Sequence, residues 1–389
     1  MGRPVYLDYH ATTPVDPRVL EAMLPYFTER FGNPASRQHA YGWEASDAVD
    51  RARAQVAALI GATAGEVVFT SGATESNNLA IKGVACALKS RGDHVITVAT
   101  EHKSVLDSCA RLERDGWTVT RLPVGQDGLL DLDRLRDALT DRTVLVSVMT
   151  ANNEIGVLQP LAAIAGVVHE RGALLHSDAA QAFGKVPFDV GAIGVDLLSL
   201  TAHKCYGPKG TGALYLRRRR PKLPVECQID GGGHEHGLRS GTLNVPGIVG
   251  LGACAELAGA ELPSESARLS ALRDRLLGGL LRSLDGVRVN GSLERRLPHN
   301  LHIGFDGIEG EALLMAIGDL AVSTGSACSS GSQAPSHVLQ AIGAVGDGGG
   351  AVIRFGLGRW STDADVDFAL DRVTTVVRSL REHRPVAHS

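Results

Sequence analysis

The 389-residue sequence has few of the features that indicate metal sites or disulfides. Its six cysteines include no C-x-x-C pair, and its histidines and cysteines form no cluster with the spacing of a zinc site. We therefore expect no bound metal. We also expect the cysteines to be the reduced thiols of a cytoplasmic protein.

The sequence also lacks the usual signs of export and of membrane insertion. The first ten residues, MGRPVYLDYH, contain no apolar core, so we expect no secretory signal peptide. No apolar run is long enough to cross a bilayer. The net charge of -4 gives no overall attraction to nucleic acid or to anionic lipid. We therefore expect no direct binding to nucleic acid or to a membrane.

The first two-thirds of the chain alternate between short apolar runs and helical patterns. The runs predict strands, and the longer amphipathic stretches between them predict helices. This alternation is typical of an α/β protein with a mostly parallel central sheet covered on both faces. The predicted strands are 67–70, 94–99, 119–123, 143–149, 173–177 and 196–200, and the predicted helices are 74–90, 104–114, 131–139 and 161–170.

The pattern changes after residue 250. A long helical stretch at 264–284 precedes strands at 287–290, 300–305 and 351–355 and helices at 309–317 and 363–380. A chain of this length exceeds what one core usually holds. We therefore predict a large domain over 12–262 and a smaller α+β domain formed by 1–11 and 263–389.

A single lysine, Lys204, follows one of these buried strands and precedes a glycine-rich turn. A lysine is costly to bury as a cation. As a neutral amine it can form a Schiff base with an aldehyde, and pyridoxal phosphate is the common aldehyde cofactor. Taken alone, Lys204 is more simply explained as an ordinary surface lysine beside a glycine turn, so its role depends on the rest of the chain.

Polar residues follow the other predicted strands. Hydroxyl and small residues at 71–78 begin a helix and could bind a phosphate, although a plain helix cap would look the same. His102 could lie over a ring or move a proton. Asp178 ends an apolar strand, where a protonated pyridine nitrogen could pair with it. Since ligands of parallel sheets bind at the carboxyl ends of the strands, we expect these loops to meet at Lys204.

A second group of reactive residues lies far downstream. Cys328 stands in the sequence STGSACSSGS, which has no apolar pattern, so we expect an exposed thiol in a loop at about 323–334. Arg354 lies inside a predicted strand, where a buried guanidinium needs a carboxylate from the protein or from a substrate.

Motifs along nearly the whole chain resemble those of the cysteine desulfurases, fold type I pyridoxal-phosphate (PLP) enzymes of the class V aminotransferase group. The longer Cys328 segment resembles the NifS/IscS-like group. The motifs, in order, are YLDYHATTP at 6–14, FGNPAS at 31–36, TSGATESNN at 70–78, EHKSVLD at 101–107, NNEIG at 152–156, HSDAAQAFGK at 176–185, AHKCYGPKG at 202–210, RSGTLNV at 239–245, STGSAC at 323–328 and IRFGLGR at 353–359.

The resemblance implies a role for each matching residue. Lys204 matches the lysine that binds the cofactor, Asp178 the partner of the pyridine nitrogen, and His102 the residue stacked on the ring. Cys328 matches the thiol that accepts sulfur. The remaining matches are Gln181 and Asn153 at the phenolic oxygen, Ala73, Thr74, Thr201 and His203 at the phosphate, Thr242 at the partner subunit's phosphate, and Asn33, Asn153 and Arg354 at the substrate carboxylate.

The implied activity is conversion of L-cysteine to L-alanine by a homodimer, with a persulfide left on Cys328 for a sulfur-acceptor protein. The acceptor could serve iron–sulfur cluster assembly, tRNA thiolation or DNA phosphorothioation. A free thiol has a pKa of about 8.5. A nearby base or the bound substrate must therefore help to deprotonate Cys328, and His102 is the candidate base. Two alternatives stay open: a selenocysteine lyase or other class V aminotransferase, and a non-catalytic sulfur-transfer scaffold.

Overall fold

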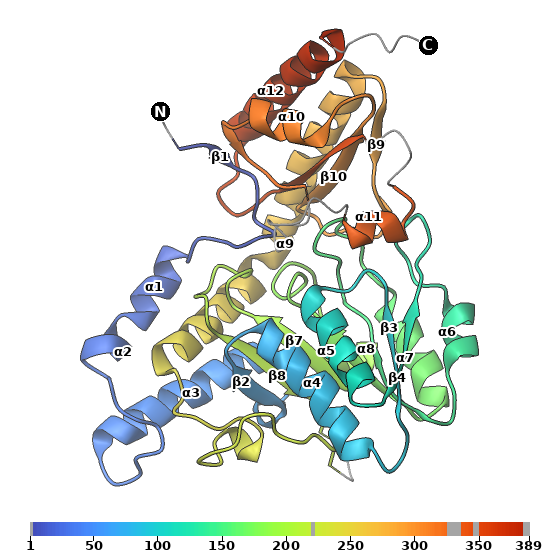
Figure 1. Cartoon of the computed structure of the whole chain (residues 1–389). Coiled ribbons are helices and arrows are strands. Elements are labelled where there is room, and N and C mark those ends of the chain that lie inside the picture. Colours follow the sequence, from blue (N-terminus) through green and yellow to red (C-terminus); the bar gives the residue numbers. More distant parts are fainter. Residues whose placement is uncertain (1–2, 219–221, 325–335, 345–349, 384–389) are drawn as a thin grey trace.

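A computed structural model describes residues 3–218, 222–324, 336–344 and 350–383. A seven-stranded sheet forms the centre of the lower part of the molecule (Figure 1). Strand β8 runs antiparallel to both of its neighbours, and the other strands share one direction. In sheet order, the strands are β2 (Val67–Thr70), β8 (Gly212–Leu216), β7 (Leu197–Thr201), β6 (Leu174–Asp178), β5 (Thr143–Ser147), β3 (His94–Val98) and β4 (Thr118–Leu122).

Helices cover both faces of this sheet, as the alternating pattern predicted. Successive residues of a strand point to opposite faces, so an apolar run supplies both layers. Leu145 and Leu197 pack with α4 (Ala73–Leu88) and α5 (Lys103–Arg114). The residues that follow them, Val146 and Leu198, belong to a larger cluster on the other face. That cluster includes α3 (Ala40–Leu59), α7 (Leu161–Glu170) and the first part of α9 (Val245–Ser283).

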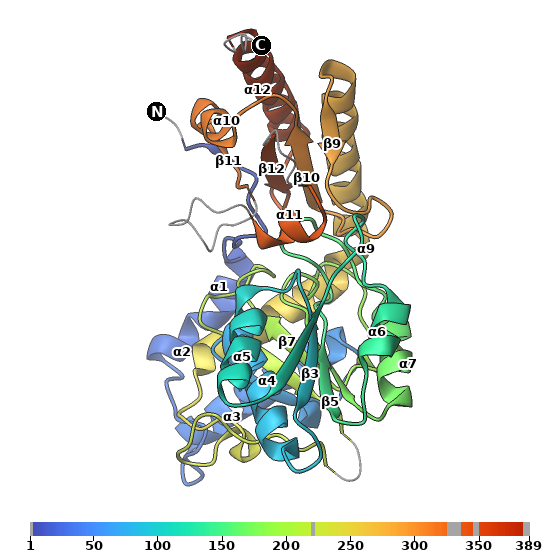
Figure 2. The same ribbon diagram turned by 45° about the vertical axis from the view of Figure 1, so that its right-hand side comes forward.

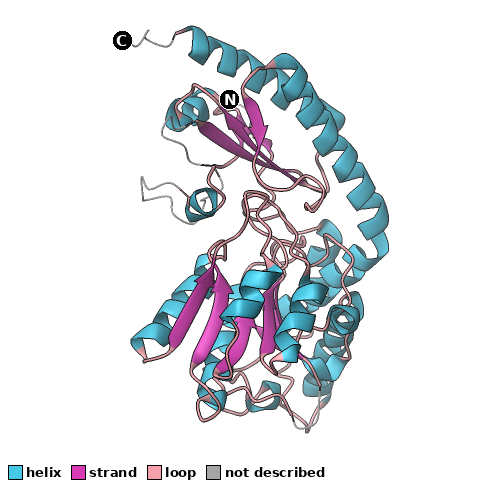
Figure 3. Ribbon diagram, turned by 90° about the vertical axis from the view of Figure 1, so that its right-hand side faces the viewer, coloured by secondary structure: helices cyan, strands magenta, loops and turns pink. Residues whose placement is uncertain are grey.

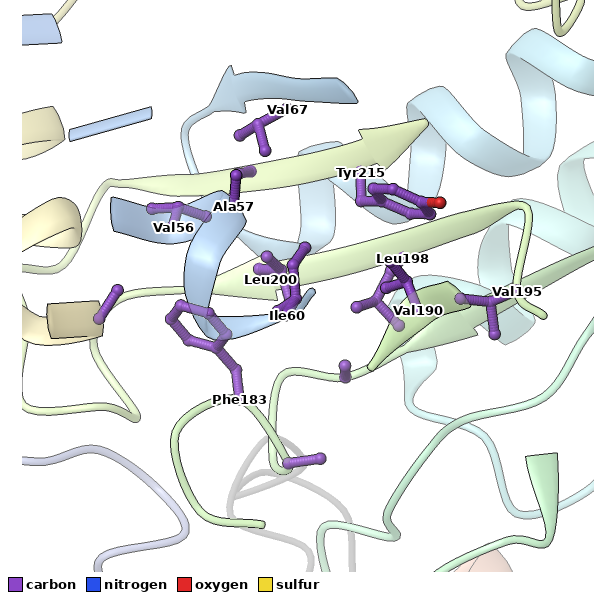
Figure 4. Close-up of a cluster of buried hydrophobic side chains, with 14 of the residues drawn as sticks. Val56, Ala57, Ile60, Val67, Phe183, Val190, Val195, Leu198, Leu200 and Tyr215 are labelled. Atoms are coloured by element: carbon purple, nitrogen blue, oxygen red, sulfur yellow. The ribbon is translucent and has the colours of Figure 1, made fainter. Parts of the chain in front are cut away.

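Figure 4 shows part of this larger cluster, where Ile60, just after α3, lies beside Leu200 of β7. The smaller helices α1 (Pro17–Met23), α2 (Pro25–Thr28), α6 (Leu132–Ala138) and α8 (Val190–Ile193) and the 3-10 turns η1 (Ala64–Glu66) and η2 (Glu235–Gly237) complete this part of the molecule.

Helix α9 connects the two parts of the molecule (Figures 1 and 3). It begins at Val245, well before the predicted start, and continues through Pro263. By length and composition it is apolar enough to cross a membrane, which the sequence analysis did not anticipate. Half of its apolar stretch is buried, and it packs along α3, α1 and α12. The buried apolar residues of this helix therefore belong to the core of the protein.

The upper part has a separate core around an antiparallel sheet, shown from the side in Figure 2. The sheet order is β12 (Ala351–Gly356), β10 (Asn300–Phe305) and β9 (Val287–Val289). Helices α10 (Gly310–Ala316), α11 (His337–Ala341) and α12 (Asp363–Glu382) belong to this part of the chain. The N-terminal strand β1 (Val5–Tyr6) pairs with β11 (Leu320–Ala321), and Leu7 enters this core. The domain limits at residues 11/12 and 262/263 stay a prediction.

Candidate active site

A cavity of about 520 Å³ lies between the two parts, at the carboxyl ends of the parallel strands. All five loops that the sequence analysis singled out contribute to its wall. They supply 71–75, 102–104, 149–154, 178–181 and 201–204. His10, His337 and Arg354 close the cavity from the N-terminal and C-terminal segments. The volume is in the range of sites that bind small molecules and cofactors.

Lys204 lies partly buried in the tight turn after β7 and lines the cavity. Tyr206, two residues later, has φ of 62°, an uncommon conformation for a bulky residue. Two contacts hold this turn: the Tyr206 N–H donates to Thr13 Oγ1 at 2.9 Å, and its hydroxyl donates to Glu265 at 2.9 Å. The turn that carries Lys204 is therefore fixed by contacts to distant parts of the chain.

The first turn of α4 forms a polar corner of the cavity. Gly72, its N-cap, has φ of 147°, which favours glycine, and Ala73 and Thr74 follow it. The first N–H groups of a helix have no partner inside the helix, so an anion is favoured here. Thr201 and His203 line the same cavity. Burial and the nearby Lys204 lower the pKa of His203 to about 4, so its ring is neutral.

Asp178 and His102 are joined by a chain of hydrogen bonds through α4 and α5. Asn77 Nδ2 donates to Asp178 Oδ2 at 2.8 Å and to Ser104 Oγ at 2.8 Å. Ser104 Oγ in turn lies 2.8 Å from His102 Nδ1. The Ala180 N–H donates to Asp178 Oδ1 at 2.9 Å. Burial, chiefly, lowers the pKa of His102.

A buried carboxyl group, Glu101, lies next to His102 in the chain. Its Oε1 accepts the Met149 N–H at 2.5 Å. Burial raises the pKa of Glu101 well above its usual value, and the nearby Asp178 carboxylate raises it further. Burial therefore favours the protonated form of Glu101 in the folded protein.

Both polar atoms of the Gln181 side-chain amide form hydrogen bonds with His10. His10 Nδ1 lies 3.0 Å from Gln181 Oε1, and Gln181 Nε2 donates to the His10 carbonyl at 3.0 Å. Asn300 Nδ2 lies 3.0 Å from His10 Nε2. Because the Asn300 amide donates, His10 carries its proton on Nδ1 and donates to Gln181. This pattern fixes the orientation of the Gln181 amide.

Arg354 is almost fully buried on β12 and points toward the loop after β5. Its Nη1 donates to the Asn153 carbonyl at 2.7 Å, and its Nη2 forms a 2.7 Å ion pair with Asp8. Asn153 Oδ1 is buried, and among the described residues it has no hydrogen-bond partner. The predicted carboxylate clamp therefore has two of its members, Arg354 and Asn153, side by side.

Most of the predicted site residues line this one cavity: Ala73, Thr74, His102, Asn153, Asp178, Gln181, Thr201, His203, Lys204 and Arg354. Asn33 and Thr242 do not line it and are exposed. Cys328 lies outside the described residues. Within the described residues, no three histidine, cysteine, aspartate or glutamate side chains are grouped as metal ligands.

Sequence reasoning did not assign roles to Asn77, Ser104, His10 or Asp8. A polar residue at a buried helix position was the available signal for Asn77, which has no exposed surface. From the sequence alone, Ser104 could be interpreted only as an ordinary serine at the start of a helix. The contacts of His10 and Asp8 join residues that are far apart in sequence, so no local pattern indicated them.

The chain is similar to known proteins over nearly its whole length. Residues 5–368 match the family model described as aminotransferase class-V. The chain is 57% identical over 386 residues to a cysteine desulfurase IscS of Anaeromyxobacter sp. (strain K), covering 99% of this chain and 95% of the relative. A solved NifS-like protein superposes with a TM-score of 0.90 at 38% identity, covering 97% of this chain and all of the other.

A second solved structure, SspA in complex with cysteine, has a TM-score of 0.81 at 38% identity and covers 92% of this chain and 99% of the other. The match to the family model and the identity to the relatives both extend over nearly the full length. The chain therefore belongs to the cysteine desulfurases of the class-V aminotransferase family.

Proposed function

We propose that this chain uses PLP in the cavity to convert L-cysteine to L-alanine and leaves the sulfur as a persulfide on Cys328. The observation that carries the proposal is the convergence of Lys204, Asp178 and His102 on one cavity with the first turn of α4. When bound, PLP supplies an electron sink that stabilises negative charge at the substrate's α-carbon.

The residues of the cavity fit this cofactor. Lys204 provides the amine for the aldehyde carbon. Asp178, only 5% exposed, provides a carboxylate for the pyridine nitrogen. The N–H groups after Gly72 suit a phosphate. The buried Asn153 Oδ1 lacks a partner among the described residues, so a bound ligand could satisfy it.

The side chains of the protein would have the following roles in the reaction. Arg354 and Asn153 bind the substrate carboxylate, which favours one orientation of the amino acid. Lys204 Nζ, as a neutral amine, removes the proton from the α-carbon. The Cys328 thiolate forms an S–S bond with the substrate sulfur as the substrate's Cβ–Sγ bond breaks. The carbon side takes up protons and leaves as L-alanine.

We further infer a cytoplasmic homodimer that passes its sulfur to an acceptor protein. Thr242 is exposed and lies outside the cavity of its own chain, as expected of a residue that serves a partner's site. The surface of α1, α2 and the start of α3 carries exposed large apolar side chains that a second subunit could cover. These are Leu20, Leu24, Phe27, Phe31, Tyr41 and Trp43.

Product analysis tests the proposed activity. The purified protein should have a visible absorption band from PLP and should release alanine and sulfide from L-cysteine in the presence of a reductant. Cys328→Ala should keep the band and stop alanine release. Formation of a keto acid in place of alanine, or continued turnover by Cys328→Ala, would contradict the proposal and favour another class-V activity.

A further inference from the structure

Asn77 is a fully buried amide located between two groups of the candidate site. It lies in the second turn of α4, and its Nδ2 reaches both Asp178 Oδ2 and Ser104 Oγ at 2.8 Å. The carboxylate accepts hydrogen bonds and cannot donate, so the NH₂ end of the amide must face it. The orientation of Asn77 is thereby fixed, although its Oδ1 has no partner within the described parts of the chain.

The orientation of Asn77 determines where the Ser104 hydroxyl can donate its hydrogen. Ser104 Oγ accepts a hydrogen from Asn77, so its own hydroxyl hydrogen is available to an acceptor. His102 Nδ1 lies 2.8 Å away and is in the right place to accept it. The Ser104 N–H also donates to His102 Nδ1, at 3.2 Å. His102 Nδ1 therefore accepts twice, and a neutral His102 carries its proton on Nε2.

We propose that Asn77 and Ser104 are positioning residues that hold His102 as the neutral Nε2–H tautomer. In this form His102 donates a hydrogen bond from Nε2 and stabilises negative charge on a thiolate sulfur in the cavity. It does not serve as the base that removes the thiol proton, the role that the sequence indicated. The inference rests on the proposed desulfurase function and specifies the chemistry of one of its residues.

The charges around His102 are consistent with a neutral ring. Lys204 after β7 and His337 of α11 face it, and both disfavour its protonation. Asp178 of β6 and Asp107 of α5 favour protonation. Burial is the largest effect and lowers the pKa of His102. A proton could be added only at Nδ1, where it would displace two hydrogen bonds.

The test is ¹⁵N NMR of the holoenzyme labelled at histidine, with His102 identified by the resonances that are missing in His102→Gln. We expect a protonated Nε2 and a non-protonated Nδ1 above the ordinary histidine pKa of about 6.5. Ser104→Ala removes one of the two donors, so the pKa of His102 should rise by about one unit. Ser104→Thr keeps the hydroxyl and should restore the wild-type titration.

Two results would overturn the inference: a proton on Nδ1 in the resting enzyme, or an unchanged His102 titration in Ser104→Ala. Asn77→Leu supplies a second variant, which should raise the pKa of His102 in the same direction by freeing Ser104 to rotate. The NMR measurement needs no turnover, so it separates the two proposals. An inactive protein with the stated tautomer would contradict only the proposed function, and an active enzyme with the other tautomer only this inference.

Discussion

Arg354 Nη2 forms a 2.7 Å ion pair with Asp8 Oδ1, which joins the C-terminal strand β12 to the residues that follow β1. The same guanidinium donates to the Asn153 carbonyl from the lower part of the molecule. The buried guanidinium on β12 therefore contacts two distant segments at the edge of the cavity. Asp8 fixes one end of the guanidinium, so in the proposed substrate site it would also limit where the substrate carboxylate binds.

Arg354→Lys should weaken substrate binding more than it weakens folding. A lysine keeps the charge but lacks the planar group that contacts Asp8 and the Asn153 carbonyl together. A hydrogen bond to a charged group contributes about 1.5–3 kcal/mol, so KM for L-cysteine should rise by about 10- to 150-fold. Steady-state alanine release measures this, and an unchanged KM would remove Arg354 from the substrate site.

Asp8→Asn should lower the free energy of unfolding, because it leaves the buried Arg354 without its anion. Breaking a buried pair costs about 3–5 kcal/mol, and the partial exposure of Asp8 places this case at about 3 kcal/mol. The matched control is Glu113→Gln, which breaks the exposed pair with Arg121 and should cost less than about 1 kcal/mol. Urea denaturation of both variants gives the comparison, and equal effects would refute it.

Asp178→Asn should retain cofactor but lose turnover. The amide cannot keep a pyridine nitrogen protonated, so kcat should fall at least about 100-fold. Asp131→Asn is a suitable control, since it removes the capping carboxylate of α6, which is exposed and does not line the cavity. Absorption spectra and alanine release distinguish the two variants. Wild-type turnover by Asp178→Asn would exclude the assigned role.

Subunit mixing tests whether Thr242 acts in the partner's site. Lys204→Ala and Thr242→Ala homodimers should each be impaired. In a mixed dimer, one site combines a wild-type Lys204 with a wild-type Thr242 from the other subunit. Mixing should therefore restore about half of a wild-type dimer's activity to each heterodimer. If mixing restores no activity, Thr242 acts within its own chain or not at all.

The stability of the protein should fall as the pH drops from about 7 toward 5. Burial lowers the pKa of His176 to about 4 and of His302 to about 3, so the unfolded chain binds more protons in this range. Each such histidine contributes up to about 1.4 kcal/mol per pH unit below an unfolded pKa near 6.5. The raised pKa of Glu101 acts in the opposite direction.

Among the described residues, buried histidines with a lowered pKa outnumber buried carboxyl groups with a raised pKa, which are Glu101 and Glu154. His10 and His299 also have pKa values far below normal. The net change with falling pH is therefore a loss of stability. Urea midpoints at several pH values measure this, and His176→Gln should reduce the slope. A stability that is flat or rises toward pH 5 would contradict the assignment of neutral buried histidines.

The parallel strands and the position of the cavity were predictable, because buried strands read as apolar runs and ligands bind at their carboxyl ends. Helix α3 was not predicted. Its apolar side is made largely of alanines such as Ala45, Ala48 and Ala52, which give a weak periodic signal. The antiparallel direction of β8 was also not predictable. It depends on tertiary pairing with β2 and β7, which a short apolar run cannot specify.

Within the site, the sequence indicated the residues that face the cavity better than those behind them. Asp178 and Lys204 could be found because charged groups at the ends of apolar strands need a partner. Asn77 and His10 act through other side chains, and these contacts arise from packing between distant segments. Their residue types alone fit many ordinary buried positions, so only the three-dimensional arrangement indicates their roles.

The central claim is that the sulfur of L-cysteine is transferred to Cys328 with the help of Lys204. The most direct measurement is mass spectrometry of the peptide that contains Cys328, after a single turnover with L-cysteine and without reductant. The account predicts a gain of one sulfur atom on that peptide in the wild-type protein and no gain in Lys204→Ala. An unmodified Cys328 in a protein that has released alanine would contradict it.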